Sequence, residues 1–146
     1  MKNFFFLLLG LLVIFGSVYL LWNRPVNMDK VGEVVKINDI SFQVELADTA
    51  ETRQQGLSGK PSLGDKEGMF FIFNTSDTHG FWMKDMKFAI DIIWISENGQ
   101  VVHVERAVEP ETYPNVFYPS VPAKYVLELA SGSANKYRID IGAVVQ

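Results

Sequence analysis

Cysteine is absent from this chain of 146 residues, and so is any cluster of lysine and arginine. Without a thiol the protein can form no disulfide, no thiolate metal site and no cysteine nucleophile. The 13 Lys and Arg residues are scattered and are outnumbered by 17 Asp and Glu, which gives a net charge of −4. Because nucleic acid needs a basic surface for its phosphates, we predict no nucleic-acid partner.

The histidine and glycine patterns exclude further kinds of site. The two histidines, His79 and His103, stand in no metal-ligand spacing, so we predict no metal site and no Ser-His-Asp arrangement. The glycines from residue 56 to residue 68 lack the Lys-Ser/Thr ending of a phosphate-binding loop. We therefore predict no cofactor. The composition, 48% hydrophobic and 21% charged, is that of a folded globular chain.

Residues 3–22 carry no charge and are almost entirely apolar. A helix of about 20 residues spans about 30 Å, the thickness of a bilayer core. We favour an uncleaved signal-anchor helix, because the run is longer than the core of a secretory signal and no A-x-A-like site follows it. A cleaved secretory signal is the alternative.

The expected organisation has three parts. Residues 1–22 form a membrane anchor whose partner is the lipid bilayer through residues 3–22, residues 23–30 form a polar linker, and residues 31–146 form one β-rich globular domain. The basic residues that flank the anchor do not decide its orientation. The short N-terminal tail and the acidic domain that follows favour a single-pass protein with this domain on the extracytoplasmic side, periplasmic or at the cell surface.

The remaining chain reads mostly as strands. Two dense apolar runs, residues 69–73 and 90–95, are typical of buried strands. Shorter patterns and turn signals predict further strands at residues 34–37, 41–46, 101–108, 125–129 and 143–145, and short helices at residues 48–56 and 131–138. This order indicates a mainly β (α+β) fold, a small partly closed β-barrel or sandwich with two short helices at its ends.

Capping signals place the ends of the two helices. We expect Asp48 or Thr49 as the N-cap of the first helix, with Glu51 completing a capping box and Gly56 ending the helix. Ser131 is the expected cap of the second helix.

Two segments rich in aromatic residues are the candidate walls of a binding site. Residues 81–88 mix large aromatics with charge, and residues 109–123 combine prolines with tyrosine and phenylalanine, which excludes helix and central strand there. Trp82 is either a stacking platform for a sugar or ring, or a plug at the end of the barrel. The candidate ligand-binding residues are Arg53, Trp82, Met83, Lys84, Asp85, Asp91, Glu109, Tyr113, Tyr118 and Glu128.

The charged candidates have two interpretations each. Arg53 either anchors an anionic group of a ligand or forms a structural ion pair with Asp91, Glu109 or Glu128. Asp91 and Glu128 stand in apolar strands, where a carboxylate is either structurally paired or used in acid–base chemistry.

The order of short motifs from about Val44 to Val145 resembles the bacterial and archaeal family called domain of unknown function 192. The matching residues are Ala47, Thr49, Arg53, Gly56 and Leu57; Gly68, Met69, Phe71 and Phe73; Trp82, Met83 and Lys84; Asp91, Ile92 and Ile93; Gly99, Val101, Val102 and His103; Glu109 and Pro110; and Tyr125 through Leu129 with Gly132. The resemblance implies a small β-rich domain, often exported or membrane-anchored, and no particular function.

The chain departs from the family pattern at two places. Asp85-Met86 stands where the family usually has Asn-Thr, and Ala89-Ile90 stands where it usually has Pro-Leu. If the Asn-Thr pair binds a ligand, this protein binds it differently.

With no recognisable catalytic set, we expect a binding or accessory domain for a small polar or carbohydrate-like ligand or an envelope protein partner. A carboxylate-based hydrolase or lyase that uses two of Asp85, Asp91, Glu109 and Glu128 is the alternative. A structural or assembly domain is the third interpretation.

Overall fold

The computed structural model of the chain describes residues 33–146. The predicted anchor and linker, residues 1–22 and 23–30, lie outside the described residues. Among residues 33–146, no helix combines the length and the apolar character needed to cross a membrane. The anchor therefore stays a prediction.

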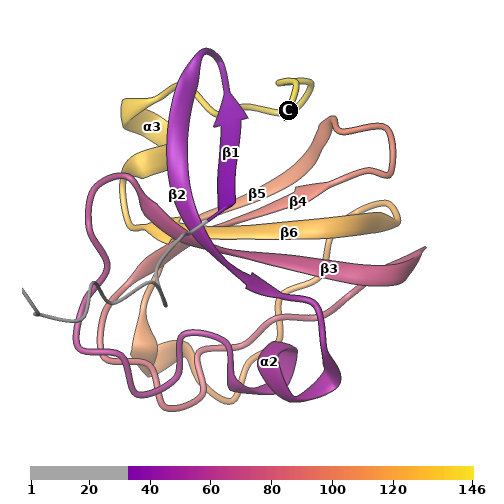
Figure 1. Cartoon of the computed structure of the whole chain (residues 1–146). Coiled ribbons are helices and arrows are strands. Elements are labelled where there is room, and N and C mark those ends of the chain that lie inside the picture. The colour runs from indigo at the N-terminus through magenta and orange to yellow at the C-terminus, as the bar shows by residue number, and fades with distance from the viewer. Residues whose placement is uncertain (1–32) are drawn as a thin grey trace, which may run out of the picture. The chain divides into compact units, whose positions relative to one another are not determined.

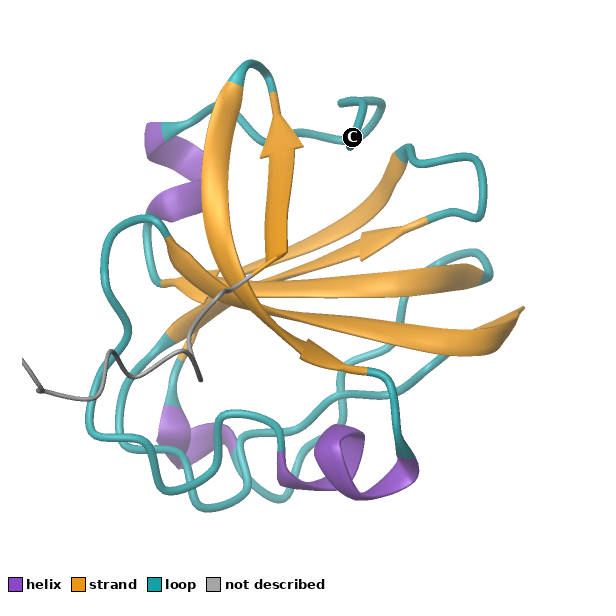
Figure 2. Ribbon diagram, in the orientation of Figure 1, coloured by secondary structure: helices purple, strands orange, loops and turns teal. Residues whose placement is uncertain are grey.

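A single six-stranded sheet dominates the fold (Figures 1 and 2). The strands follow the order β1-β2-β3-β6-β4-β5. Their bounds are Glu33–Ile37 for β1, Ile40–Ala47 for β2, Glu67–Asp77 for β3, Ile90–Ile95 for β4, Val101–Val108 for β5 and Ala123–Ala130 for β6. Only β2 and β3 pair in parallel; the other neighbours are antiparallel. The predicted mainly β fold with two short helices is confirmed, and in residues 33–146 the sheet is not closed, since its edge strands β1 and β5 do not pair.

Local turn chemistry explains the first hairpin. Asn38 and Asp39 join β1 to β2, and both have positive φ angles, of 49° and 65°. A two-residue turn with positive φ at both positions matches the twist of paired strands, and Asn and Asp tolerate this conformation well. The predicted hairpin is confirmed.

The two helices form where expected, with different caps. Helix α2, Ala50–Gln55, begins at Thr49 and ends at Gly56, and the partner in its capping box is Thr52, not the predicted Glu51. Helix α3, Ser133–Lys136, begins at Gly132 without a side-chain cap, so the expectation for Ser131 was wrong. The proline-rich loop also contains one turn of 3₁₀ helix, Pro110–Thr112, which our expectation of no helix missed. Proline is well tolerated at a helix start because its missing N–H has no partner there.

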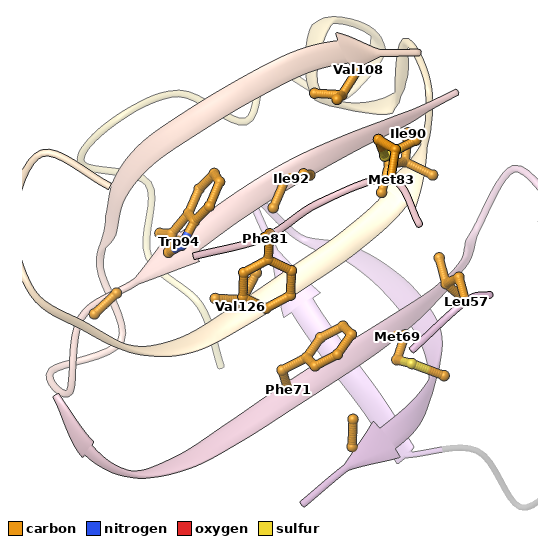
Figure 3. Packing of buried hydrophobic residues seen from close by; sticks show 12 residues of the cluster. Leu57, Met69, Phe71, Phe81, Met83, Ile90, Ile92, Trp94, Val108 and Val126 are labelled. Atoms are coloured by element: carbon orange, nitrogen blue, oxygen red, sulfur yellow. The ribbon is translucent and has the colours of Figure 1, made fainter. Parts of the chain in front are cut away.

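The sheet buries a hydrophobic cluster on each face. On one face, Trp94 and Ile92 of β4 pack with Phe71 of β3 and with Phe81 and Met83 of the β3–β4 connection (Figure 3). On the other face, buried residues of β1, β2, β4, β5 and β6 pack against Ala134 and Ile139 of the chain around α3. The strand residues of this cluster are Val35, Ile37, Phe42, Val44, Ile93, Ile95, Val101, Leu127 and Leu129. Helix α2 and the long loops gather at one end of the sheet, and α3 lies at the other end (Figure 1).

The C-terminal residues lie between the two edges of the sheet. Lys36 of β1 exchanges two backbone hydrogen bonds with Gln146, each 2.8 Å long. Val101 of β5 donates to the carbonyl of Ala143 at 2.9 Å. The strand predicted at residues 143–145 is present as isolated bridges, to Ile37 and to Gln100.

Asp91 is a fully buried carboxylate with two backbone partners. Its Oδ1 accepts from the N–H of Ala107 at 2.8 Å, and its Oδ2 accepts from the N–H of Ala134 at 2.7 Å. The second bond satisfies a free N–H in the first turn of α3, which explains why this helix needs no cap of its own. Asp91 therefore ties α3 and β5 to the central strand.

Replacing Asp91 by alanine leaves two backbone N–H groups without an acceptor. We expect Asp91→Ala to lower the free energy of unfolding by about 2–5 kcal/mol. Urea denaturation of the full-length protein measures this loss. The matched control is Asp48→Ala, at an exposed position whose carboxylate makes no hydrogen bond or ion pair within residues 33–146, where a change below about 0.5 kcal/mol is expected. Equal effects of the two substitutions would contradict this role of Asp91.

Candidate functional site

A cleft of about 270 Å³ lies where α2 approaches the β3–β4 connection. One wall is the end of α2 and the residues that follow it, and the opposite wall is the start of the β3–β4 connection. The lining residues are Arg53 to Ser58, Phe71, Phe73, His79 to Trp82, Met86 and Glu128. Pockets for drug-sized ligands usually occupy about 300–1,000 Å³, so this cleft suits a molecule as small as a monosaccharide.

Glu128 is the buried acidic residue of the cleft. It lies on β6 between Met69 of β3 and Ile92 of β4, and both cross-strand neighbours are apolar. Only 4% of its surface is exposed, and its Oε2 has no hydrogen-bond partner among residues 33–146. Burial raises the pKa of this carboxyl from 4.5 to about 8. At neutral pH the group is therefore mostly protonated.

Arg53 holds one wall of the cleft to the sheet. Its Nη1 donates to the backbone carbonyl of Asp48 at 2.6 Å and to that of Ile72 at 2.8 Å. The guanidinium also lies over the ring of Phe73, 5.3 Å from its centre. Within residues 33–146 none of the ion pairs expected for Arg53, with Asp91, Glu109 or Glu128, forms.

An aromatic layer supports the opposite wall. His79 stacks on Phe73, with ring centres 3.6 Å apart, and its carbonyl accepts from Trp94 Nε1 at 2.9 Å. Phe81 meets the rings of Phe71 and Trp94 edge-on, at 4.9 Å and 5.8 Å (Figure 3). Sequence reasoning missed Phe71, Phe73 and His79 as site residues; the one signal was that Phe71 and Phe73 alternate along one strand and so share a face.

Residues 81–84 of the segment predicted to carry the site alternate between the core and the solvent. Phe81 and Met83 point into the core with 8% and 1% exposure, so Phe81 occupies the apolar cluster while Trp82 is 52% exposed at the rim of the cleft. Lys84 is exposed, and Asp85 takes a positive φ of 56°, which ends the extended stretch. Of these candidates only Trp82 lines the cleft.

The proline- and tyrosine-rich loop does lie against this segment, on its other side. Phe81 and Phe117 exchange two backbone hydrogen bonds, of 2.9 Å and 2.8 Å, and Tyr113 contacts Trp82 edge-on at 6.3 Å. Gly80 allows this approach, because a Cβ there would lie 2.6 Å from the ring of Tyr118. Tyr113 contacts Trp82 and Tyr118 lies against Gly80, but neither tyrosine lines the cleft.

The candidate carboxylates do not gather. Asp91 is opposite Leu129 in the β4–β6 pairing, so its side chain lies on the other face of the sheet from Glu128. Asp85 and Glu109 are exposed, and neither lines the cleft. In the described part of the chain, no group of three or more His, Asp or Glu is placed to hold a metal ion.

The comparisons with known proteins agree with the motifs. The profile of domain of unknown function 192, described as "Uncharacterized ACR", matches residues 33–146. The chain belongs to this family. A search of the curated proteins found no match.

Two solved structures share the fold. A protein of unknown function from Novosphingobium aromaticivorans DSM 12444 is 28% identical, with a TM-score of 0.75 over 84% of this chain and 89% of that one. A protein from Sinorhizobium meliloti 1021, described as a candidate transcription regulator, is 24% identical, with a TM-score of 0.74 over 80% of this chain and 94% of that one. The second shows similarity of fold alone.

One departure from the usual family motif changes the cleft itself. The positive φ of Asp85 suits Asp as well as the usual Asn, so that replacement keeps the backbone. Met86, which replaces the usual Thr, lines the cleft. The chain therefore has an apolar thioether at this point of the cleft, where the motif of the resemblance has a hydroxyl.

The buried carboxyl makes the stability of the fold depend on pH. Because the pKa of Glu128 is higher in the folded state, about 8 against 4.5, its contribution is fully present below 4.5 and is lost as the pH rises through 8. Integrating between these values predicts a free energy of unfolding roughly 2–3 kcal/mol lower at pH 9 than at pH 6 from this group.

Urea titrations at both pH values measure this difference, and Glu128→Gln should remove it. Glu45→Gln is the matched control, since Glu45 lies in the same cross-strand row of the sheet but is exposed and paired with Lys60 at 2.6 Å. An unchanged pH dependence in Glu128→Gln would show that this carboxyl titrates normally.

Proposed function

We propose that this protein is a membrane-anchored extracytoplasmic binding domain, which holds a small polar or carbohydrate-like ligand in the cleft between α2 and Trp82. The observation that carries the proposal is the buried Glu128 carboxyl, which lines the cleft and whose Oε2 has no protein partner among residues 33–146. A buried polar group without a partner is unfavourable by about 1–3 kcal/mol, and a bound ligand that hydrogen-bonds to it recovers that energy.

Trp82 supplies the second half of a recognition site. Its half-exposed ring stands at the rim and is held edge-on by Tyr113. A rigid aromatic face beside a polar group is the usual arrangement for binding a ring that carries hydroxyls. Arg53 lines the same cleft, where its bonds to two backbone carbonyls hold the guanidinium at the wall.

The catalytic alternative has less support. A carboxylate-based hydrolase or lyase needs two carboxyl groups about 5–10 Å apart in one cleft. Of its four candidate residues, Asp85, Asp91, Glu109 and Glu128, Glu128 alone lines the cleft. Binding without chemistry is the function that this arrangement favours.

A ligand screen with Trp82 variants tests the proposal. Full-length protein in mild detergent is screened by thermal shift against envelope saccharides, amino acids and nucleotides. For any compound that binds, we expect Trp82→Ala to weaken the affinity by about 10- to 100-fold, because stacking on an exposed ring contributes about 1–3 kcal/mol.

Two further variants show whether a loss of affinity comes from the missing ring. Trp82→Phe keeps a ring and should recover part of the affinity, and Ile141→Ala, at an exposed position that does not line the cleft, should have no effect. The proposal fails if no compound in the screen binds, or if binding is the same in Trp82→Ala.

A further inference from the structure

Resting on the proposed function, we infer that the cleft selects ligands that carry a primary ammonium group, which pairs with Glu128 while an adjoining ring lies against Trp82. Two features of the described residues lead to this ligand class: the surroundings of Glu128 and the placement of the other charged groups near the cleft.

The surroundings of Glu128 give its carboxyl no counter-charge. β3 and β4 present Met69 and Ile92 to it, and no salt bridge of residues 33–146 includes it. Burial alone accounts for the raised pKa, so no cation of residues 33–146 compensates the charge of this carboxyl. An ammonium group brought in by a ligand would supply the positive charge that these residues do not.

The other charged groups near the cleft either have a partner within the protein or are exposed to solvent. On this face of the sheet, Glu45 of β2 pairs with Lys60, and Glu105 of β5 bonds to His103 at 3.0 Å. The charged and titratable side chains of the two elements that wall the cleft are Glu51 and Arg53 of α2, and His79, Lys84, Asp85 and Lys87 of the β3–β4 connection, of which Lys84, Asp85 and Lys87 are exposed and do not line the cleft.

Arg53 and His79 line the cleft but are fixed at its walls. Arg53 bonds to two backbone carbonyls, and His79 Nε2 lies 3.0 Å from the carbonyl of Thr75. Both also contact the ring of Phe73, which keeps them in the aromatic layer. The cleft thus offers a ligand one unpaired acid at depth, which favours a cation over a neutral group.

Binding of an ammonium ligand requires Glu128 in its ionised form, so the proton it carries is released to solvent. With a pKa of about 8, the ionised fraction rises from about 1% at pH 6 to half at pH 8. The apparent affinity for a ligand amine that stays protonated over this range should therefore rise about 50-fold between pH 6 and pH 8. A neutral ligand gives no such rise.

Matched pairs of probes test the inference on the full-length protein. We would measure dissociation constants by ligand-observed NMR at pH 6, 7 and 8 for 2-aminoethyl β-glucoside against 2-hydroxyethyl β-glucoside. A second pair is 2-phenylethylamine against 2-phenylethanol. We expect the amine of each pair to bind at least 10-fold more tightly at pH 8, with the pH profile described above.

Glu128→Gln should abolish both the preference for amines and its pH dependence, while Glu45→Gln should preserve them. A second variant, Glu128→Asp, keeps the acid in case glutamine disturbs the fold, and it should retain the rise with pH. The inference is overturned if amine and alcohol bind within twofold of each other, or if Glu128→Gln binds the amines as the parent does.

The outcome separates the two proposals. If the alcohols or other neutral compounds bind through Trp82 and the amines have no advantage, the ammonium assignment is wrong and the binding function stands. If neither these probes nor any compound of the wider screen binds, both are wrong.

Discussion

The structure depends on the burial of both faces of its central strands. All six residues of β4 are buried, and so are four consecutive residues of β6, from Val126 to Leu129. On such strands every side chain must be apolar or must find a partner inside the fold. Asp91 and Glu128 are the two acidic residues on these buried strands, and only Asp91 finds such partners among residues 33–146.

Asp91 finds its hydrogen-bond partners within the protein, whereas Glu128 Oε2 finds none among residues 33–146. The first accepts two backbone N–H groups and so serves the architecture. The second faces a cleft with no partner among the described residues, and its environment favours the neutral acid. A buried carboxyl with a raised pKa in a concave site is a candidate functional group, whereas a buried carboxylate that accepts backbone hydrogen bonds serves the fold.

Local patterns were sufficient to predict most elements of the fold. The turn at Asn38-Asp39, the helix that ends at Gly56 and the apolar strand β4 all follow from neighbouring residues, and the family motifs supported their order. The strand order and the fact that the sheet stays open depend on pairings between distant segments, which alternation along one strand does not determine.

The site was predicted only in part, because it too depends on pairings between distant segments. Trp82, Arg53 and Glu128 were identified as candidates and do line one cleft. Asp91 was grouped with them because both acids stand in apolar strands, but the register of β4 on β6 places it on the opposite face. The wall facing Trp82 was assigned to residues 109–123, since nothing in the chain around Arg53 indicates that α2 folds over β3.

The two carbonyl acceptors of Arg53 have a consequence for how this family can change over evolutionary time. Every amino acid supplies a backbone carbonyl, so a substitution at position 48 or 72 that keeps the backbone in place leaves both bonds of the guanidinium intact. The wall of the cleft is thereby insulated from sequence divergence at those positions. A substitution at a lining position such as Met86 likewise leaves this support unchanged.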